Sequence, residues 1–407
     1  MARIHRLARV LAVGALGLAV LPLATTAPAR AAAANCGFGS GGPDASTICW
    51  LDMSAFNSTA AQTAAGQQMT ISVTPSYTVS FTVHLAAGAT GLRTINAVAF
   101  PTWSGTPIGN AVYTGTPGKP ALYQSGSGKA GAQGTITLSG ITVNGPGGGA
   151  LDGYGFVTAD AESTNAGEGL TFGSDKPIRQ LADVTPSGYA PACGGGLTGL
   201  GTANVTCLGN TNASVGDLVT YTIAPTQVSA AFTNSGTSDL QGVAFGVLVS
   251  KVGLSKTVTA RAAAGDSFGL NISDAAGNTI ATADTGTSGT ATTGAQAVLS
   301  GIPAVDYTFS ESGDGSTDLA QYTQSWSCTN GGQSDPGLPS GSGTTKTVAV
   351  AVGDDIECTI TNSPPVEVTP LTPMITPAAE AGAGGIGVLG LGLIALRRRR
   401  MGTSVRR

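Results

Sequence analysis

Short stretches in which apolar and polar residues alternate recur along this chain, and they restrict its fold more than any other feature. In Tyr77–Leu85 every second residue is apolar, and Val219–Ile223 and Val243–Val249 repeat that spacing. Because successive side chains of a strand point to opposite faces, the pattern predicts half-buried β-strands. Glycine-rich turns such as Asn144–Gly149 separate the strands, and no segment of the exported region has a useful helical period. The chain is therefore expected to be all-β, built from antiparallel β-sandwiches.

The region rich in strands is about 330 residues long, which is too long for one small sandwich. We divide it after Val252, which predicts one sandwich domain over residues 35–252 and a second over residues 253–363. Residues 364–380 are rich in proline, which predicts an extended linker between the second domain and the C-terminal segment.

The two ends of the chain indicate export. Arginines precede the apolar stretch Val10–Val20, and the small residues Ala29–Ala34 suit cleavage, so residues 1–34 are predicted to be a signal peptide. Near the other end, Ala381–Leu396 would span about 24 Å as a helix, against roughly 30 Å of bilayer hydrocarbon. Residues 381–396 are predicted to be a short transmembrane segment. The basic tail 397–407, which begins with Arg397–Arg400, is predicted to be cytoplasmic.

The charge of the exported region argues against nucleic acid as a partner. Ten of the 19 basic residues lie in the terminal segments, which leaves nine between Asn35 and Leu396 against all 23 acidic residues. A strongly acidic surface has no basic patch for phosphates. The expected partners are therefore an extracellular protein or glycan, together with the membrane or cell wall at the C-terminus.

Six cysteines fall into three pairs that are close in sequence. An even number of cysteines in an exported chain predicts disulfides. Of the fifteen connectivities that six cysteines allow, local pairing is the simplest, although spacing alone leaves the others open. The expected pairs are Cys36 with Cys49, Cys193 with Cys207, and Cys328 with Cys358. A zinc site is not expected, because no CxxC occurs and His84, on the polar side of its strand, is the one histidine outside the signal peptide.

The C-terminal order of apolar segment and basic tail resembles the sorting signal of Gram-positive wall proteins. The LPxTG motif of that signal is missing, and the nearest text is Leu371–Pro377. Attachment to the wall by a sortase-like enzyme and simple retention in the membrane therefore both remain open.

The stretch Asp152–Glu168, which reads DGYGFVTADAESTNAGE, is the most distinctive text of the first domain. It resembles a motif of fibrillar surface adhesins of the CshA-related type, and Leu240–Val247 is similar to the closing strand of the same kind of domain. The resemblance implies a ligand-binding β-sandwich. Trp50 and Trp103 are expected to be core residues rather than stacking platforms for sugars.

This acidic stretch also contains candidate metal ligands. Asp160, Glu162, Asn165 and Glu168 could gather oxygen atoms around Ca²⁺, because alternate strand residues share a face and the following loop can fold back. A simply solvated acidic loop is the preferred interpretation, and no other cofactor is expected. With Asp152, the same carboxyl groups would suffice for glycoside hydrolysis. No GxSxG, HExxH or phosphate-binding loop occurs, so we expect that the protein is not an enzyme.

Three polar residues of the second domain share their strand faces with apolar residues. They are Lys256 in the first strand, Glu311 in a middle strand and Asn362 in the last. Burial of an unpaired polar side chain costs several kcal/mol, so inward-facing side chains of this kind are expected to meet.

This arrangement resembles the prealbumin-like domains of the SpaA/CnaB type in Gram-positive pilins and adhesins. The resemblance implies that Lys256 and Asn362 form an intramolecular isopeptide bond and that Glu311, in the box Tyr307–Glu311, assists. Burial favours the neutral amine of the lysine and the protonated carboxyl of the glutamate, which suits attack on the carboxamide. The alternative is a domain without the bond, in which Lys256 lies at an exposed strand start and Asn362 in the exit turn.

The sequence thus predicts a non-enzymatic adhesin on the cell surface, with a ligand-binding sandwich presented on a braced prealbumin-like domain. A structural pilus or surface-layer subunit that binds copies of itself is the alternative, and a secreted glycan-active enzyme is the third choice.

Overall fold

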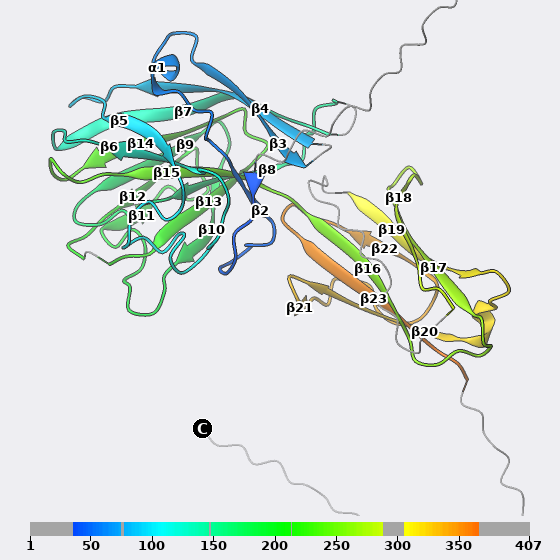
Figure 1. Ribbon diagram of the computed structural model, residues 1–407. Helices are drawn as coiled ribbons and strands as arrows, with labels where there is room; N and C mark the ends of the chain where they lie inside the picture. Colours follow the sequence, from blue (N-terminus) through cyan, green and yellow to red (C-terminus); the bar gives the residue numbers. More distant parts are fainter. Residues whose placement is uncertain (1–35, 75–76, 146–147, 213, 288–304, 366–407) are drawn as a thin grey trace, which may run out of the picture. The chain divides into compact units, whose positions relative to one another are not determined.

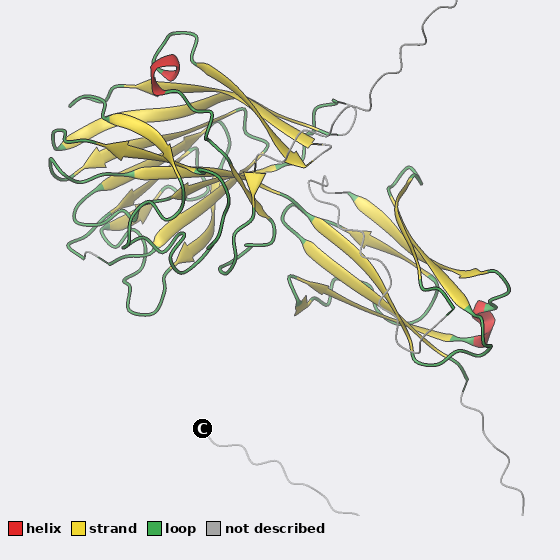
Figure 2. Cartoon of the chain, viewed as in Figure 1, coloured by secondary structure: helices red, strands yellow, loops and turns green. Residues whose placement is uncertain are grey.

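The computed structural model describes residues 36–74, 77–145, 148–212, 214–287 and 305–365. The expected signal peptide and the expected membrane segment lie outside these residues. Strands dominate the described part (Figures 1 and 2), and the helical elements are the short α1 (Ser58–Ala61) and the 3-10 turn η1 (Leu319–Gln321). Within the described ranges, no helix has the length and apolar character that crossing a membrane requires.

Two large sheets form the N-terminal sandwich. The first sheet has the order β1 (Cys36–Gly37), β2 (Ile48–Leu51), β15 (Gly242–Leu248), β8 (Gly155–Asp160), β13 (Asp217–Ile223) and β10 (Ile178–Val184), with β6 (Ala121–Ser125) also paired to β15 and β5 (Thr94–Val98) to β6. The second has the order β11 (Gly196–Thr198), β12 (Asn204–Leu208), β9 (Gly169–Ser174), β14 (Gln227–Asn234), β7 (Gly131–Asn144), β4 (Tyr77–Ala86) and β3 (Gln67–Thr74).

The core of this sandwich lies between the two sheets. Val79, Phe81, Val83 and Leu85 of β4 point into it, and His84 lies on the other face of the strand and is partly exposed. Alternation in β4 therefore predicted its buried face correctly.

A second apolar cluster covers the outer face of the first sheet. It includes Trp50 of β2 and Val219 of β13, packed with Ile108 and Tyr113 from the long connection 99–120 between β5 and β6. Because both faces of this sheet are covered, β15 is buried at every position. The interpretation of Val219–Ile223 as one buried face was wrong, since Val219 packs outward under the connection and Ile223 is 40% exposed.

Two four-stranded sheets form the C-terminal sandwich. One has the order β16 (Lys251–Val258), β23 (Asp355–Ser363), β20 (Thr323–Asn330) and β21 (Gln333–Ser334). The other has the order β18 (Thr279–Asp284), β17 (Ser267–Ser273), β19 (Asp306–Asp314) and β22 (Thr345–Ala349). Apolar residues of both sheets meet in one core, which includes Leu254, Ile272, Phe309 and Ile360.

One strand pairing departs from the expected antiparallel pattern. The first and last strands of the C-terminal sandwich, β16 and β23, run parallel, with Lys256 opposite Ile360 and Val258 opposite Asn362. A parallel pair needs a long connection, and here the rest of the sandwich supplies it. The other strands of this sandwich pair antiparallel.

The three expected disulfides are present. They join Cys36 to Cys49, Cys193 to Cys207, and Cys328 to Cys358, so the local connectivity predicted from the sequence is confirmed. Cys328 of β20 and Cys358 of β23 lie directly opposite each other in the ladder. The last strand is thus covalently joined to one of its two neighbours.

Candidate functional site

Lys256, Glu311 and Asn362 meet inside the C-terminal sandwich. Lys256 and Asn362 point inward from β16 and β23 of one sheet, and Glu311 reaches them from β19 of the facing sheet. Their exposed fractions are 1%, 7% and 0% for Lys256, Glu311 and Asn362. The alternative placed Lys256 at an exposed strand start and Asn362 in the exit turn, and these positions are wrong, because both residues are buried and lie within strands. Formation of the bond itself stays a prediction.

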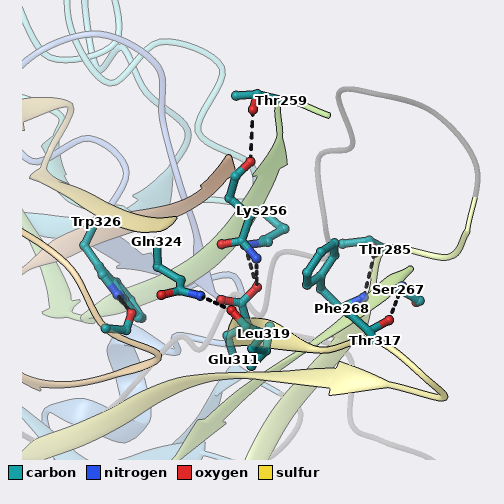
Figure 3. A network of polar contacts seen from close by, with 12 residues as sticks. Lys256, Thr259, Ser267, Phe268, Thr285, Glu311, Thr317, Leu319, Gln324 and Trp326 are labelled. Carbon is teal, nitrogen blue, oxygen red and sulfur yellow. Dashed lines mark hydrogen bonds and ion pairs between the residues drawn. The ribbon is translucent and has the colours of Figure 1, made fainter. Parts of the chain in front are cut away.

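Lys256 and Asn362 both contact the same carboxylate oxygen of Glu311. Glu311 Oε1 lies 2.5 Å from Lys256 Nζ and accepts a hydrogen bond of 2.7 Å from Asn362 Nδ2. Figure 3 shows the lysine and glutamate side chains pointing toward each other across the sandwich. Glu311 Oε2 and Asn362 Oδ1 are buried and have no hydrogen-bond partner within the part of the chain that the structure describes.

The surroundings of the amine are apolar. Lys256 Nζ lies 4.9 Å from the centre of the Phe268 ring, which packs edge-on against Tyr322. These rings and Val258 form a small buried cluster. Burial lowers the pKa of Lys256 to about 8, although the hydrogen bond and the charge of Glu311 act in the opposite direction. About a tenth of the amine is therefore neutral, and nucleophilic, at pH 7.

This geometry suits amide transfer from the asparagine to the lysine. Asn362 Nδ2 faces the Glu311 carboxyl group in the structure. Rotating the carboxamide by a half-turn exchanges its nitrogen and oxygen, so that Oδ1 faces Glu311 instead. In that orientation Oδ1 can accept a hydrogen bond from a proton that the Glu311 carboxyl group carries, which polarises the carbonyl that the amine attacks.

A second cluster of polar residues lies in the N-terminal sandwich, in the loop between β8 and β9. A hollow of about 220 Å³ opens there, lined by Trp103, Tyr123, Glu162, Asn165, Glu168, Ser238, Asp239 and Leu240. We call it the acidic pocket. Three of the four candidate calcium ligands, Glu162, Asn165 and Glu168, thus lie together on its wall.

The fourth candidate ligand, Asp160, has a different role. Its Oδ1 accepts hydrogen bonds from the backbone N–H groups of Glu162 and Ser163, and its Oδ2 accepts from the backbone and hydroxyl of Thr164. Asp160 therefore holds the loop after β8 in shape. Within the described ranges, no three side chains of His, Cys, Asp or Glu are grouped as metal binding requires, and the calcium site stays a prediction.

A buried acid that the sequence did not single out supports the same loop. Asp217 of β13 accepts hydrogen bonds from Thr106 Oγ1 and Ile108 N, each at 2.8 Å, and from Ser163 Oγ at 2.5 Å. Burial, followed by the charge of Asp160, raises the pKa of Asp217 well above its usual range. No local pattern marks this residue, because its partners come from two distant loops.

Sequence reasoning placed Trp103 in the core and did not find the other pocket residues outside the loop. Trp103 and Tyr123 are partly exposed and line the hollow, so the expectation that Trp103 is a core residue was wrong. The exposed carboxyl of Asp152 precedes β8, whereas Asp160 ends that strand and Glu162 follows it. The structure thus separates Asp152 from the other three carboxyl groups considered for glycoside hydrolysis.

Comparison with protein families gives two matches. Residues 46–249 are similar to the family described as surface adhesin CshA non-repetitive domain 2. Residues 251–364 are similar to the SpaA family, described as a prealbumin-like fold domain. No curated protein matches the chain.

Two solved structures are also similar to parts of the chain. The major pilin of Streptococcus pyogenes is 13% identical, with 52% of this chain and 99% of the pilin covered and a TM-score of 0.19. An adhesin of Mobiluncus mulieris, described as containing intramolecular disulfide, isopeptide and ester bond cross-links, is 12% identical, with 61% and 92% covered and a TM-score of 0.20. Similarity at these scores supports no conclusion about this chain.

Proposed function

The chain belongs to the family of the surface adhesin CshA non-repetitive domain 2, and on this premise we propose that it is an adhesin whose two sandwiches divide the work. The first binds an extracellular protein or glycan. The second, a prealbumin-like domain, carries the pulling force between that ligand and the cell. The two family matches imply an exported protein of the cell surface. We propose that its C-terminal segment anchors it in the membrane or to the cell wall.

The observation that carries this proposal is the buried contact among Lys256, Glu311 and Asn362. In the proposed reaction the neutral amine of Lys256 attacks the Asn362 carboxamide carbon, so that a new C–N bond forms and the bond to Nδ2 breaks. Glu311 takes a proton from the attacking amine and gives one to Nδ2, which leaves as ammonia. The product is an amide that joins β16 to β23.

The position of this bond suits a domain under tension. Because β16 and β23 are parallel, the start of the first strand and the end of the last lie at opposite ends of the pair, and force applied there shears the two strands. A bond between residues 256 and 362 passes the force directly from one strand to the other. Residues 257–361 are then outside the path of the force, and the Cys328–Cys358 disulfide ties β20 to the same last strand.

Detachment under flow tests this function. The full chain is displayed on a non-adherent bacterium, and the cells are placed on surfaces coated with extracellular matrix proteins or glycans. We expect adhesion that withstands rising shear, and earlier detachment of cells that carry the double variant Lys256→Met, Glu311→Gln. Failure of the displayed chain to adhere to any coated surface contradicts the proposal.

A structural pilus or surface-layer subunit is the second candidate, favoured by the match of residues 251–364 to a SpaA prealbumin-like domain. Such a subunit binds copies of itself. Sedimentation of the purified chain over a range of concentrations separates the two: the adhesin stays monomeric, and the subunit forms oligomers that grow with concentration.

We propose no catalytic turnover for this protein. Incubation with a panel of polysaccharides tests that point directly. Release of sugars by the wild type, together with loss of that release in Glu162→Gln, contradicts it and favours the glycan-active enzyme.

A further inference from the structure

The acidic pocket combines aromatic rings and carboxyl groups contributed by four separate segments. Trp103 comes from the connection between β5 and β6, and Tyr123 from β6 itself. The loop between β8 and β9 supplies two carboxyl groups, and the loop between β14 and β15 supplies a third, that of Asp239. None of the residues that line the hollow is a lysine or an arginine. The pocket therefore presents carboxyl groups and aromatic rings to a ligand.

Glu162 is the unusual residue of this wall. Its side chain is only 7% exposed, and its Oε2 has no hydrogen-bond partner among the described residues. The backbone on either side is fixed, since Trp103 Nε1 donates to the carbonyl oxygen of Glu162, and Thr102 Oγ1 donates to that of Ala161 at 2.6 Å. A buried carboxyl oxygen without a donor is costly, and the residue that carries it lines the hollow.

The charged groups near Glu162 have other hydrogen-bond partners. Glu168 Oε2 accepts a hydrogen bond of 3.2 Å from the backbone of Asn165. The nearby guanidinium of Arg93 donates to the backbone oxygens of Asp239 and Gly236.

Burial is the main cause of the raised pKa values of the groups in this pocket, and the neighbouring carboxyl groups add to it. Burial, followed by the charges of Glu168, Asp160, Asp217 and Asp239, raises the pKa of Glu162 well above its usual range. Burial also raises the pKa of Glu168 to about 8, an effect that Arg93 partly opposes. The pKa of Tyr123 is raised to about 12, by burial first and then by the two glutamates. A cation inside the pocket would lower these pKa values and release protons from the carboxyl groups.

The walls fit an organic cation better than Ca²⁺ or a sugar. Calcium takes six to eight oxygen ligands, whereas Asp160 is committed to the loop and two walls of the pocket are rings. An oligosaccharide needs a larger site, because pockets for drug-sized ligands have volumes of about 300–1,000 Å³. A hollow of about 220 Å³ suits a single side chain.

We propose that the acidic pocket binds a guanidinium or alkylammonium group presented by the protein ligand. Glu162 accepts hydrogen bonds from the cation, and the ring faces of Trp103 and Tyr123 contact it, as in other sites where aromatic rings bind cations. This inference rests on the proposed adhesin function and adds to it the chemical class of the group that is recognised, an arginine or lysine side chain.

The test uses the full chain and two small probes of nearly the same shape, one charged and one neutral. N-acetyl-arginine methylamide carries the guanidinium, and N-acetyl-citrulline methylamide is its neutral counterpart. Titration calorimetry gives the affinity, and repeating it in buffers of different ionisation enthalpy gives the protons released. Trp103 is the one tryptophan that is not buried, so its fluorescence reports whether the probe enters this pocket.

We expect the arginine probe to bind, to release protons and to change the fluorescence, and the citrulline probe not to bind. Glu162→Gln is expected to weaken binding by roughly ten- to a hundred-fold, as the loss of a charged hydrogen-bond partner does. The matched control Asp152→Asn removes one exposed charge before β8 and should leave the affinity unchanged. Trp103→Leu provides a second variant in case Glu162→Gln does not fold, and it should also weaken binding.

Several results overturn the inference. They are equal binding of the two probes, no binding of either, unchanged affinity in Glu162→Gln, or saturation of the pocket by calcium chloride or by neutral monosaccharides instead of the arginine probe. Adhesion of displayed cells that persists in Glu162→Gln also overturns it and leaves the adhesin function standing. A wild type that binds the probe but adheres to no surface contradicts the adhesin function instead.

Discussion

Replacing Lys256 with methionine and Glu311 with glutamine removes the proposed cross-link without leaving a charge buried. Single replacement of either residue would leave the other as an unpaired buried charge, which is strongly destabilising by itself. In the double variant, the carbonyl oxygen of the new glutamine can still accept the hydrogen bond from Asn362 Nδ2. Replacing a buried ion pair with uncharged groups of similar volume often changes the stability of a protein very little. The loss of stability in the double variant therefore measures the contribution of the cross-link.

The expected loss follows from the loop that the bond closes. Lys256 and Asn362 are 106 positions apart, and closing a loop of about 100 residues stabilises the folded state by about 4.7 kcal/mol in the chain-entropy model. The Cys328–Cys358 disulfide already shortens that loop by its separation of 30 residues, which lowers the gain by only about 0.3 kcal/mol. We expect a loss of about 4–5 kcal/mol, or roughly 15–20 °C in the melting temperature of the second domain.

Scanning calorimetry of the full chain measures this shift. The matched control is Lys346→Met with Glu357→Gln, which makes the same chemical changes at partly exposed positions of the same sandwich and should leave the melting temperature almost unchanged. Equal melting temperatures for the wild type and the Lys256, Glu311 double variant would show that no stabilising bond joins Lys256 to Asn362.

Three further predictions concern the rate of bond formation, the neighbouring disulfide and the pocket. During refolding, the rate of ammonia loss should increase as the pH rises to about 8, the lowered pKa of Lys256, and then level off. Intact masses of quenched samples measure this rate. A constant rate between about pH 6 and pH 9 would contradict the prediction. Replacing both Cys328 and Cys358 with serine should lower the stability measured by denaturant titration by roughly 3–4 kcal/mol. The isopeptide bond should still form, with loss of ammonia. If the bond does not form in this variant, the disulfide is needed to align the strands. Since the pKa of Glu168 rises from 4.5 to about 8 on folding, the folded state holds a proton that the unfolded state releases in that window, and the stability of the first domain should fall as the pH rises through it. Glu168→Gln should flatten that dependence in calorimetry, and an unchanged slope would contradict it.

The alternation of strand residues carried most of what could be predicted for the second domain. Because side chains two apart share a face, the sequence alone places residues 256, 311 and 362 on the inner faces of their strands. The parallel pairing of β16 with β23 could not be read in the same way. Alternation indicates which face of a strand is buried, but it does not indicate which strand lies beside it or in which direction.

Fewer of the packing contacts and pocket residues of the first domain could be predicted from the sequence, because irregular segments form them. Trp50 and Val219 pack against an irregular connection that covers the outer face of a sheet, and such a connection has no periodic pattern. The walls of the acidic pocket come from four segments that lie far apart in sequence. Spacing within the loop between β8 and β9 could therefore identify Glu162 and Glu168, but not Tyr123, which faces the same hollow.

The most direct test of the central claim is the intact mass of residues 35–365, measured before and after reduction of the disulfides. We expect a reduced species about 17 Da lighter than the formula mass, which is the mass of the ammonia lost when Lys256 attacks Asn362. Before reduction the mass should be about 2 Da lower for each disulfide. The deficit should disappear in Lys256→Met, Glu311→Gln. A reduced wild type whose mass equals the formula mass would contradict the claim that the second domain is a covalently braced, force-carrying element.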